Sequence, residues 1–313
     1  MIKPKAILML VFLLFPISLF AQNTTKFQLS VLDENGKFIS DLKPSDIQIQ
    51  INKQTAQIRS LRLKKNESLD VFFLIDISVS QERVLPDEKR AVEGVIDKLL
   101  IANKDRVAIA SFDVNVGLEQ DLTGDFPLVK KQLGGIKIKF PPGYIGGGIF
   151  ASQEPVTSNL SGSTSIWTCL KKVLTAFASI DAGKARRVLI LITDGVSTSG
   201  EGSRNDVIDL ASKTNIPIYA IGIGDESYSG VDKGNLKTLS SNSGGMAIFP
   251  KKENSNLNEL ITSVEASFHN YYEVELELPV TKLSTRQDIK IEFSDPASRK
   301  RKFSIIASRI LIQ

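Results

Sequence analysis

Cysteine and histidine are nearly absent from this sequence. Among 313 residues there is one Cys, Cys169, and one His, His269. A single Cys excludes both a disulfide framework and a zinc site built from several thiolates. A single His excludes a His-rich metal site and argues against Ser-His-Asp catalysis. Function classes that depend on clusters of thiolate or imidazole groups are therefore not expected.

A strong charge of either sign is missing as well. Lys and Arg number 39 and Asp and Glu 35, which gives a formal net charge of +4 with His neutral and an isoelectric point near 8.9. No dense stripe of Lys and Arg accompanies this small excess, so the charge by itself does not indicate a nucleic-acid partner. With 42% hydrophobic and 24% charged residues, the composition is that of a globular protein of one to three domains.

Long apolar runs are missing except at the N-terminus. There, Lys3 and Lys5 precede an apolar run from Ala6 to Phe20 that contains Pro16, and the small residue Ala21 follows it. A basic start, a short apolar core and a small residue are the features of a cleavable signal peptide. The alternative, a transmembrane anchor, is disfavoured by the proline and by the length of the run. We expect cleavage after Ala21 and export to the periplasm, the cell surface or the medium, with no transmembrane segment in the mature chain.

Residues 27–63 and 271–313 have the two-residue hydrophobic period of β-strands, and the polar residues 64–69 are interpreted as a linker. The alternating stretches are Phe27–Val31, Ile47–Ile51, Val274–Leu278, Ile289–Phe293 and Phe303–Ile306. Asn35-Gly36 is a strong hairpin-turn signal in the first region. Each region is too small to bury a core alone. We therefore expect the two regions to pair into one small β-sandwich, with the intervening segment inserted between them.

Residues 70–268 alternate between buried strands and amphipathic helices. Continuous apolar runs predict parallel strands that are covered on both faces, and these runs are Val71–Ile75, Val107–Ala110, Val188–Ile192 and Ile216–Ile221. Apolar residues recur at helical spacing in Val92–Leu99, Leu170–Phe177 and Asn258–Phe268. This alternation predicts an α/β fold with a doubly wound, mostly parallel sheet.

Oxygen-bearing side chains follow two of these strands and precede a helix. The first strand is followed by Asp76-Ile77-Ser78-Val79-Ser80 and the third by Thr193-Asp194-Gly195, while Gly162-Ser163-Thr164-Ser165 stands before the helix near Ile166. Ligands of an open α/β sheet bind beyond the carboxyl ends of its strands. The three segments are therefore expected to converge on one edge of the sheet.

The converging side chains suit a hard divalent cation. Mg²⁺ prefers six oxygen ligands and keeps several waters. Asp76, Ser78 and Ser80 can point the same way from a tight turn, and Thr164 and Asp194 can add a hydroxyl and a second carboxylate. Two carboxylates balance the charge of the ion, and the hydroxyls are neutral. The ion would stay electrophilic and would gain from an acidic side chain that arrives from outside as its next ligand.

This pattern resembles the metal-ion-dependent adhesion site of von Willebrand factor type A (VWA) domains, whose signature is Asp-x-Ser-x-Ser followed by a Thr and an Asp. Asp76, Ser78, Ser80, Thr164 and Asp194 fill the five positions. The resemblance covers about residues 70–268 and implies a Rossmann-like sheet of order 3-2-1-4-5-6. It also implies Mg²⁺, or Mn²⁺ or Ca²⁺, on the upper face of that sheet.

The sequence departs from the family pattern in two places. Gly-Ser-Thr stands where Gly-Gly-Thr is more usual, and Ser-Val-Ser-Gln stands where Ser-Gly-Ser-Met is common. In layout, the flanking β segments resemble those of bacterial exported VWFA-related proteins, with Tyr271-Tyr272-Glu273-Val274 as the strand that follows the domain.

Some residues leave alternatives open. The glycine-rich excursion at 134–161 is either a partner-binding loop or a disordered surface. Asp113 ends another buried strand and either supports the site from outside or has no part in it. Ser197–Ser199 are interpreted as a solvated loop rather than a specificity element. Asp121 and Asp125 are interpreted as turn residues.

These observations predict an exported, metal-dependent protein-binding module that captures a Glu or Asp of a partner protein and is not an enzyme. The alternative is a structural or assembly protein of the cell envelope whose metal site is only stabilising. A hydrolase that uses the ion as a Lewis acid would lack an obvious general base beyond Asp194. The expected organisation is a signal peptide at 1–21, an N-terminal β segment at 22–69, a VWA domain at 70–268 and a C-terminal β segment at 269–313.

Overall fold

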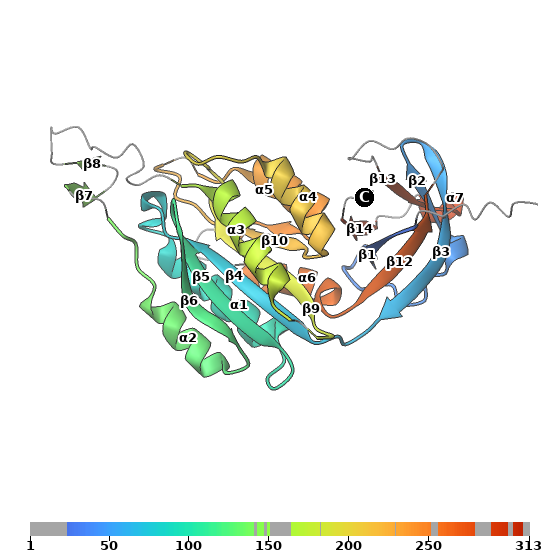
Figure 1. The fold of residues 1–313 in the computed structure, drawn as a ribbon, viewed down its shortest axis with the longest axis horizontal. Coiled ribbons are helices and arrows are strands. Elements are labelled where there is room, and N and C mark those ends of the chain that lie inside the picture. The colour runs from blue at the N-terminus through green and yellow to red at the C-terminus, as the bar shows by residue number, and fades with distance from the viewer. Residues whose placement is uncertain are drawn as a thin grey trace, which may run out of the picture.

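The computed structural model of the chain describes residues 24–140, 143–146, 149–150, 164–181, 183–228, 230–251, 256–278, 289–299 and 303–308. The predicted signal peptide lies outside these residues. They form two six-stranded sheets and a short two-stranded ribbon (Figure 1). Within the described part of the chain, no helix has the length and apolar character needed to cross a membrane.

The first sheet belongs to an α/β unit and has the strand order β11-β10-β9-β4-β5-β6. Its strands are β4 (Leu69–Asp76), β5 (Arg106–Phe112), β6 (Val116–Thr123), β9 (Arg186–Thr193), β10 (Ile218–Gly222) and β11 (Ala247–Ile248). All neighbours are parallel except β5 and β6. Read from β6 and renumbered within this sheet, the order is 3-2-1-4-5-6, which confirms the expected topology.

Helices cover both faces of this sheet, as predicted for a doubly wound fold. The buried residues of α1 (Leu85–Leu99), α2 (Phe126–Gly135) and α6 (Leu257–Phe268) share one apolar cluster. Those of α3 (Ile166–Ser179), α4 (Arg204–Thr214) and α5 (Lys233–Ser243) share the other (Figure 1). The carboxyl ends of the parallel strands therefore open between two helical layers.

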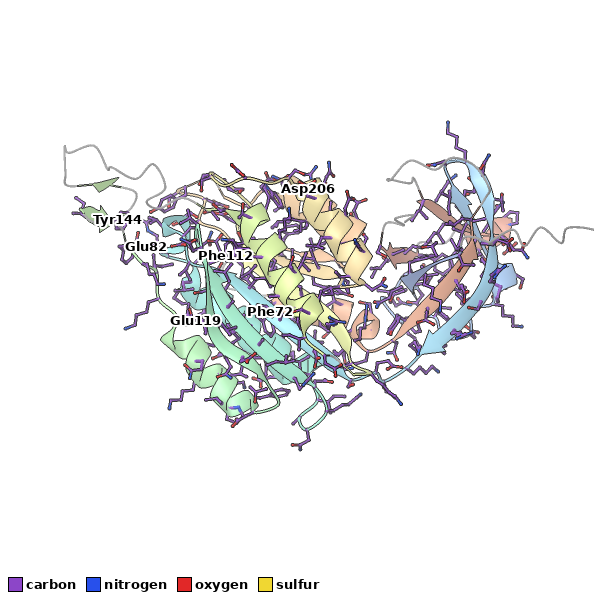
Figure 2. The ribbon with its side chains drawn as sticks, in the orientation of Figure 1. Phe72, Glu82, Phe112, Glu119, Tyr144 and Asp206 are labelled. Atoms are coloured by element: carbon purple, nitrogen blue, oxygen red, sulfur yellow. The ribbon has the colours of Figure 1, made fainter. Side chains whose placement is uncertain are left out.

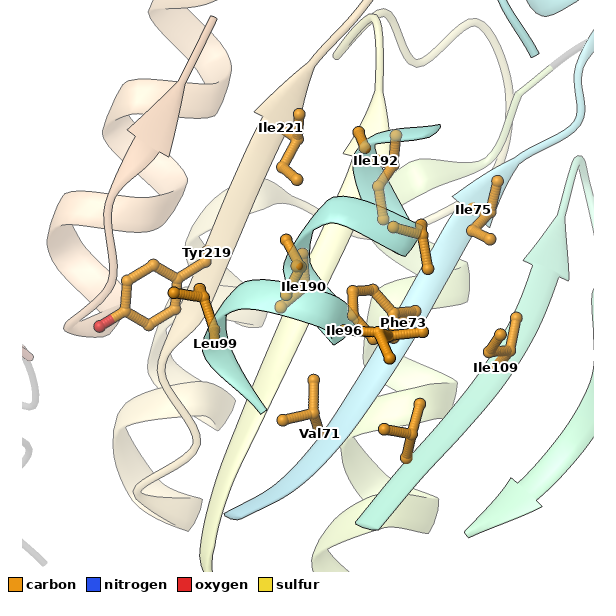
Figure 3. Packing of buried hydrophobic residues seen from close by; sticks show 14 of the residues in the cluster. Val71, Phe73, Ile75, Ile96, Leu99, Ile109, Ile190, Ile192, Tyr219 and Ile221 are labelled. Atoms are coloured by element: carbon orange, nitrogen blue, oxygen red, sulfur yellow. The ribbon is translucent and has the colours of Figure 1, made fainter. Parts of the chain in front are cut away.

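The central strand β4 supplies both apolar clusters. Phe73 and Ile75 pack on the α1 side, whereas Phe72 and Leu74 pack on the α3 side, because successive side chains of a strand point to opposite faces. Figure 3 shows Phe73 and Ile75 among isoleucines of the neighbouring strands, close to Ile96 of α1. Each fully buried side chain of this size contributes about 2 kcal/mol to the free energy of unfolding. The end of β4, where Asp76 lies, is thus held firmly.

The second sheet is antiparallel and joins the two ends of the described chain. Its order is β13-β2-β3-β12-β1-β14. The N-terminal region gives β1 (Thr24–Leu32), β2 (Ile47–Ile51) and β3 (Gln54–Lys64), and the C-terminal region gives β12 (Tyr271–Glu277), β13 (Ile289–Phe293) and β14 (Ser304–Ala307). Both regions contribute to one apolar core. The predicted pairing of the terminal segments, with the α/β unit inserted between β3 and β12, is confirmed.

Local sequence accounts for two turns near this sheet. The Asn35-Gly36 turn is present, and the Asp33 carboxylate accepts hydrogen bonds from the backbone N–H groups of Asn35 and Lys37, both at 2.9 Å. Asn52 and Lys53, with φ of 50° and 67°, make the tight turn between β2 and β3. Positive φ at both central residues matches the right-handed twist of the strands.

Arg186 and His269 hold the last helix of the α/β unit where the chain returns to the antiparallel sheet. Arg186 donates from Nη1 to the carbonyl oxygens of Ser267 (2.6 Å) and Phe268 (2.5 Å), and from Nε to Gln28 on β1 (2.9 Å). The His269 Nε2 atom lies 2.7 Å from the carbonyl oxygen of Leu99. These contacts satisfy carbonyl groups at the ends of α6 and α1.

Candidate functional site

The Asp-x-Ser-x-Ser segment forms a tight turn at the carboxyl end of β4. Asp76 is the last residue of the strand, and a single 3₁₀ turn, η2, spans Val79–Gln81. The Asp76 carboxylate accepts hydrogen bonds from the Ser78 backbone N–H (2.9 Å) and from the Thr193 hydroxyl (2.5 Å). Its side chain is completely buried.

A chain of hydrogen bonds connects this turn to the end of β9. The Ser78 and Ser80 hydroxyl oxygens are 3.1 Å apart, and the Ser80 hydroxyl donates to Asp194 Oδ2 at 2.8 Å. Asp194 Oδ1 accepts from the Val196 backbone N–H at 2.8 Å. Four of the five predicted ligand residues therefore lie together at the carboxyl edge of the sheet, although 114 positions separate Ser80 from Asp194.

Asp194 lies in a closely packed turn. Gly195, the next residue, has a φ of +83°, a value that favours glycine. A Cβ atom at Gly224 would lie 2.9 Å from the Asp194 Cβ and 2.5 Å from the Gly230 carbonyl oxygen. The loop after β10 therefore packs directly behind this carboxylate.

Thr164, the fifth predicted ligand, is buried just before α3 and is held by its backbone. Its N–H donates to the Thr198 hydroxyl (2.9 Å), and its carbonyl accepts from the Thr198 and Ser199 N–H groups (2.9 and 3.0 Å). This loop begins within five residues of Asp194, so Thr164 is joined to the same edge of the sheet. That the Thr164 hydroxyl binds the cation remains a prediction. The role of residues 197–199 in positioning Thr164 was missed by the sequence reasoning.

Two other aspartates differ in the part they play. The Asp113 carbonyl accepts from the Ser165 N–H at 2.9 Å, so its backbone positions the segment next to Thr164, while its carboxylate caps Asn115. The interpretation of Asp121 as a turn residue is wrong, because it lies within β6. The apolar periodicity of β6 is weak, since that strand is exposed or half-buried along its length.

Burial controls the protonation of the two site carboxylates. Burial first, and then the charge of Asp194, raises the pKa of Asp76 from 3.8 to about 7, against the opposing effect of its hydrogen bonds. Burial also raises the pKa of Asp194. Within the described residues, neither carboxylate makes an ion pair with Lys or Arg. Two buried acids without a cationic partner favour either protonation or a bound cation.

Two buried polar side chains beside the site were not anticipated. Gln81, which takes the place of the more usual Met, is fully buried and donates from Nε2 to the Ser80 hydroxyl at 3.1 Å. Glu88 is also fully buried, and burial followed by the charges of Asp76 and Asp194 raises its pKa well above the ordinary value. Glu88 interrupts the apolar stripe of α1, which is the sequence signal that could have identified it.

The described start of the long excursion reaches back to this edge of the sheet. Tyr144, in strand β7 (Tyr144–Gly146), donates to the Glu82 carboxylate and lies 3.0 Å from the Tyr228 hydroxyl oxygen (Figure 2). Arg83 pairs with Asp225 at 3.5 Å. The segment after η2, the β7 arm and the loop after β10 are thereby linked. Whether the excursion binds a partner remains a prediction, and residues 151–161 lie outside the described part.

The donor set fits a hard cation better than a soft one. The polar side-chain atoms described at the site are oxygens of carboxylate and hydroxyl groups, apart from the Gln81 amide. Within the described residues, no three His, Cys, Asp or Glu side chains gather closely enough to hold a metal ion by themselves. Any ion here would therefore depend on the serine hydroxyls and on water. Cys169 is buried in α3, where its pKa rises to about 11, so its thiol stays protonated.

Sequence comparison supports the identity of the α/β unit. Residues 154–263 match the family model of the von Willebrand factor type A domain. The matched segment includes Thr164 and Asp194 and begins after Asp76, Ser78 and Ser80. No curated protein sequence matches the chain.

Several solved structures of low sequence identity are similar to this chain. Conserved hypothetical protein BatB from Bacteroides thetaiotaomicron is 18% identical, with 63% of this chain and 97% of that chain covered and a TM-score of 0.45. Manganese-loaded TRAP protein of Plasmodium vivax is 17% identical, with 80% and 96% covered and a TM-score of 0.47. Proximal thread matrix protein 1 from the mussel byssus, with a zinc-occupied MIDAS motif, is 16% identical, with 70% and 50% covered and a TM-score of 0.49.

The family match covers α3, α4 and α5, the first part of α6 and strands β9 to β11. The strand order and the two helical layers extend the same fold to β4, β5 and β6. This chain therefore contains a von Willebrand factor type A domain.

Proposed function

We propose that the protein is an exported module that binds a partner protein through a divalent cation. The cation, Mg²⁺ with Mn²⁺ or Ca²⁺ as alternatives, would be held by Asp76, Ser78, Ser80, Thr164 and Asp194. When bound, it supplies a positive charge that attracts a Glu or Asp carboxylate of the partner. The observation that carries the proposal is the hydrogen-bond network that runs from Asp76 through the Ser78 backbone N–H and the Ser78 and Ser80 hydroxyls to Asp194, at the carboxyl edge of the sheet.

The electrostatics of the network support a cation. Asp76 and Asp194 are 0% and 2% exposed, and burial raises the pKa of both. A buried carboxylate is stabilised by an opposite charge, and none of the described Lys or Arg side chains supplies one here. A divalent ion would supply it and would be neutralised by the two acids.

The exposure pattern supports an approach from outside. Asp76, Ser78 and Asp194 are buried, whereas Ser80 is half-buried and Thr198 is exposed. A partner side chain would therefore reach the ion past Ser80 and Thr198. Neutral hydroxyls among the ligands leave charge on the ion for that side chain.

A binding role fits the site better than catalysis. The His269 ring faces the backbone carbonyls of Glu67 and Leu99, and the Cys169 thiol stays protonated. Neither residue is thus available as a nucleophile or general base for a reaction at Asp76. Export rests on the signal-peptide pattern of the first 21 residues.

The test is selection of peptide ligands. A library of displayed random peptides is panned on the immobilised protein in Mg²⁺, and bound clones are eluted with EDTA. We expect the eluted peptides to require one Glu or Asp, to lose binding when that residue is changed to Gln or Asn, and to bind neither Asp76→Ala nor Ser80→Ala. Glu34→Gln, which removes an exposed carboxylate in the antiparallel unit, should bind like the wild type.

Two outcomes would contradict the proposal. Peptides that bind equally in EDTA, or that bind Asp76→Ala unchanged, would show that recognition does not use the cation. A rise in melting temperature with Mg²⁺, together with no acid-dependent ligand, would instead support the alternative of a stabilising metal in a structural protein of the cell envelope.

A further inference from the structure

Glu88 occupies a position where an apolar residue is expected. The buried residues of α1 are Leu85, Glu88, Ala91, Val92, Val95, Ile96 and Leu99, which form one stripe at helical spacing. Leu85 and Val92 on either side of Glu88 along this stripe belong to the apolar core between helix and sheet. A carboxyl group in such a stripe lowers stability unless something compensates for its burial.

Glu88 has no compensation within the described part of the chain. Its side chain is 0% exposed, and neither carboxyl oxygen has a hydrogen-bond partner there. The charges that act on it are those of Asp76 and Asp194, and both are negative. The turn of α1 that carries Glu88 follows η2 directly, because the Val84 N–H donates to the Gln81 carbonyl and the Glu88 N–H to the Val84 carbonyl, both at 3.0 Å. The Glu88 carboxyl therefore lies near the network described above, within reach of the charges of both aspartates.

Gln81 also has a buried oxygen atom without a described hydrogen-bond partner. Its amide nitrogen donates to Ser80. Three buried acceptor atoms, two on Glu88 and one on Gln81, thus lack donors beside the same site. Buried polar atoms without partners are rare in folded proteins and point to a missing group.

Ion binding would provide those donors. A serine hydroxyl that turns a lone pair to a cation must direct its proton elsewhere, and water on a cation donates both of its protons. At present the Ser80 proton goes to Asp194, which is itself a proposed ligand. Ser78, Ser80 and cation-bound water would therefore need acceptors, and Glu88 and Gln81 have buried oxygens without described donors.

We propose that Glu88 is a positioning residue of the cation site, and that it accepts hydrogen bonds from the hydroxyls and water that surround the ion. It acts through these groups and not as a direct ligand, in agreement with the absence of a compact three-carboxylate cluster among the described residues. The inference rests on the cation of the proposed function. It adds a third acid to the site, so the occupied site carries a net charge of about −1 when all three acids are ionised.

The experiment measures cation affinity and stability in parallel. Mg²⁺ and Mn²⁺ are titrated calorimetrically into the wild type, Glu88→Gln and Glu93→Gln, and melting temperatures are recorded in EDTA and in Mg²⁺. We expect Glu88→Gln to bind the cation about 10- to 100-fold more weakly, as when a partner of a metal ligand is lost. Without metal, Glu88→Gln should melt above the wild type, because an uncompensated buried carboxyl is removed. Glu93→Gln makes the same charge change at a half-buried position of α1 and should alter neither quantity.

Glu88→Met, which fills the same space without a polar group, is the second variant. It should melt higher still in EDTA and bind the cation as weakly as Glu88→Gln. A wild-type affinity retained within twofold by both variants would overturn the role of Glu88 and leave the proposed function intact. A wild-type protein that binds no divalent cation would overturn both proposals. If the variants lose cation affinity and the wild type has no acid-dependent peptide ligand, the positioning role of Glu88 is supported and the capture of a partner's acidic side chain is contradicted.

Discussion

The metal-free protein should become less stable as the pH rises from 5 to 8. In the native state the pKa of Asp76 is about 7, whereas the ordinary value of 3.8 applies to the unfolded chain. Between these values the native state keeps a proton that the unfolded state has lost. Unfolding then releases a proton, so the free energy of unfolding falls with increasing pH.

The size of this effect follows from the difference between the two pKa values. Each pH unit in the window contributes about 1.4 kcal/mol, and the full difference corresponds to about 4 kcal/mol. From pH 5 to pH 8 the expected loss is about 3 kcal/mol, because the fall levels off above pH 7. The raised pKa values of Asp194 and Glu88 act in the same direction. A small domain is only about 5–15 kcal/mol stable, so the loss is easily measured.

A bound cation should cancel this loss of stability, because it keeps the carboxylates ionised in the native state as they are in the unfolded chain. Protons and the ion compete for the same carboxylates, so stabilisation by Mg²⁺ grows as the pH rises. The assay is urea unfolding at pH 5, 6, 7 and 8, in EDTA and in saturating Mg²⁺, with Asp76→Asn as the variant that cannot ionise. The variant in EDTA should lose the Asp76 share of the slope, about 3 kcal/mol between pH 5 and pH 8, and should keep the share of Asp194 and Glu88. Metal-free wild type that is as stable at pH 8 as at pH 5, or a variant that keeps the full slope, would refute the reasoning.

Two further predictions concern packing around the site and at the junction. Gly224→Ala should lower the free energy of unfolding by about 2 kcal/mol and weaken cation binding, because its Cβ would press on Gly230 and Asp194. Gly234→Ala is the control, since Gly234 lies inside α5 and a Cβ there would make only an ordinary van der Waals contact. It should be neutral or slightly stabilising in the same urea titration. Arg186→Met should cost about 3 kcal/mol, because two carbonyl groups at the end of α6 lose a charged donor, while Arg186→Lys should lose less. Equal stability of Met and Lys variants at this position would contradict the importance of the charge.

Strong local signals allowed much of the α/β fold to be predicted from the sequence. The runs Val71–Ile75 and Val188–Ile192 are buried on both faces, and such continuous, β-branched apolar sequence is typical of a covered parallel strand. The alternation in Ile47–Ile51 likewise matches one buried and one wetter face. Strand β6 has no such signal, because it is an edge strand whose residues are all at least partly exposed.

The candidate site was predicted in part for a different reason. Asp76, Ser78, Ser80 and Asp194 could be grouped because strand ends of one sheet meet at one edge, which is a rule of topology. The functions of Gln81, Glu88 and the 197–199 loop depend on which polar atoms remain without partners and which backbone groups meet. Those facts arise from packing between elements far apart in the chain, and the one sign of them in the sequence is the place of Glu88 within the apolar stripe of α1.

The placement of β12 between β3 and β1 also governs the order in which this protein can fold during synthesis. Among the described strands, the partners of β1 are β12 and β14, and about 200 residues, from Leu69 to Phe268, emerge from the ribosome before either of them. The α/β unit, whose strands and helices follow one another closely, can mature during this interval. The antiparallel sheet has a high contact order and is expected to form last, so the newly made N-terminal strands must be kept from aggregating until the end of the chain arrives.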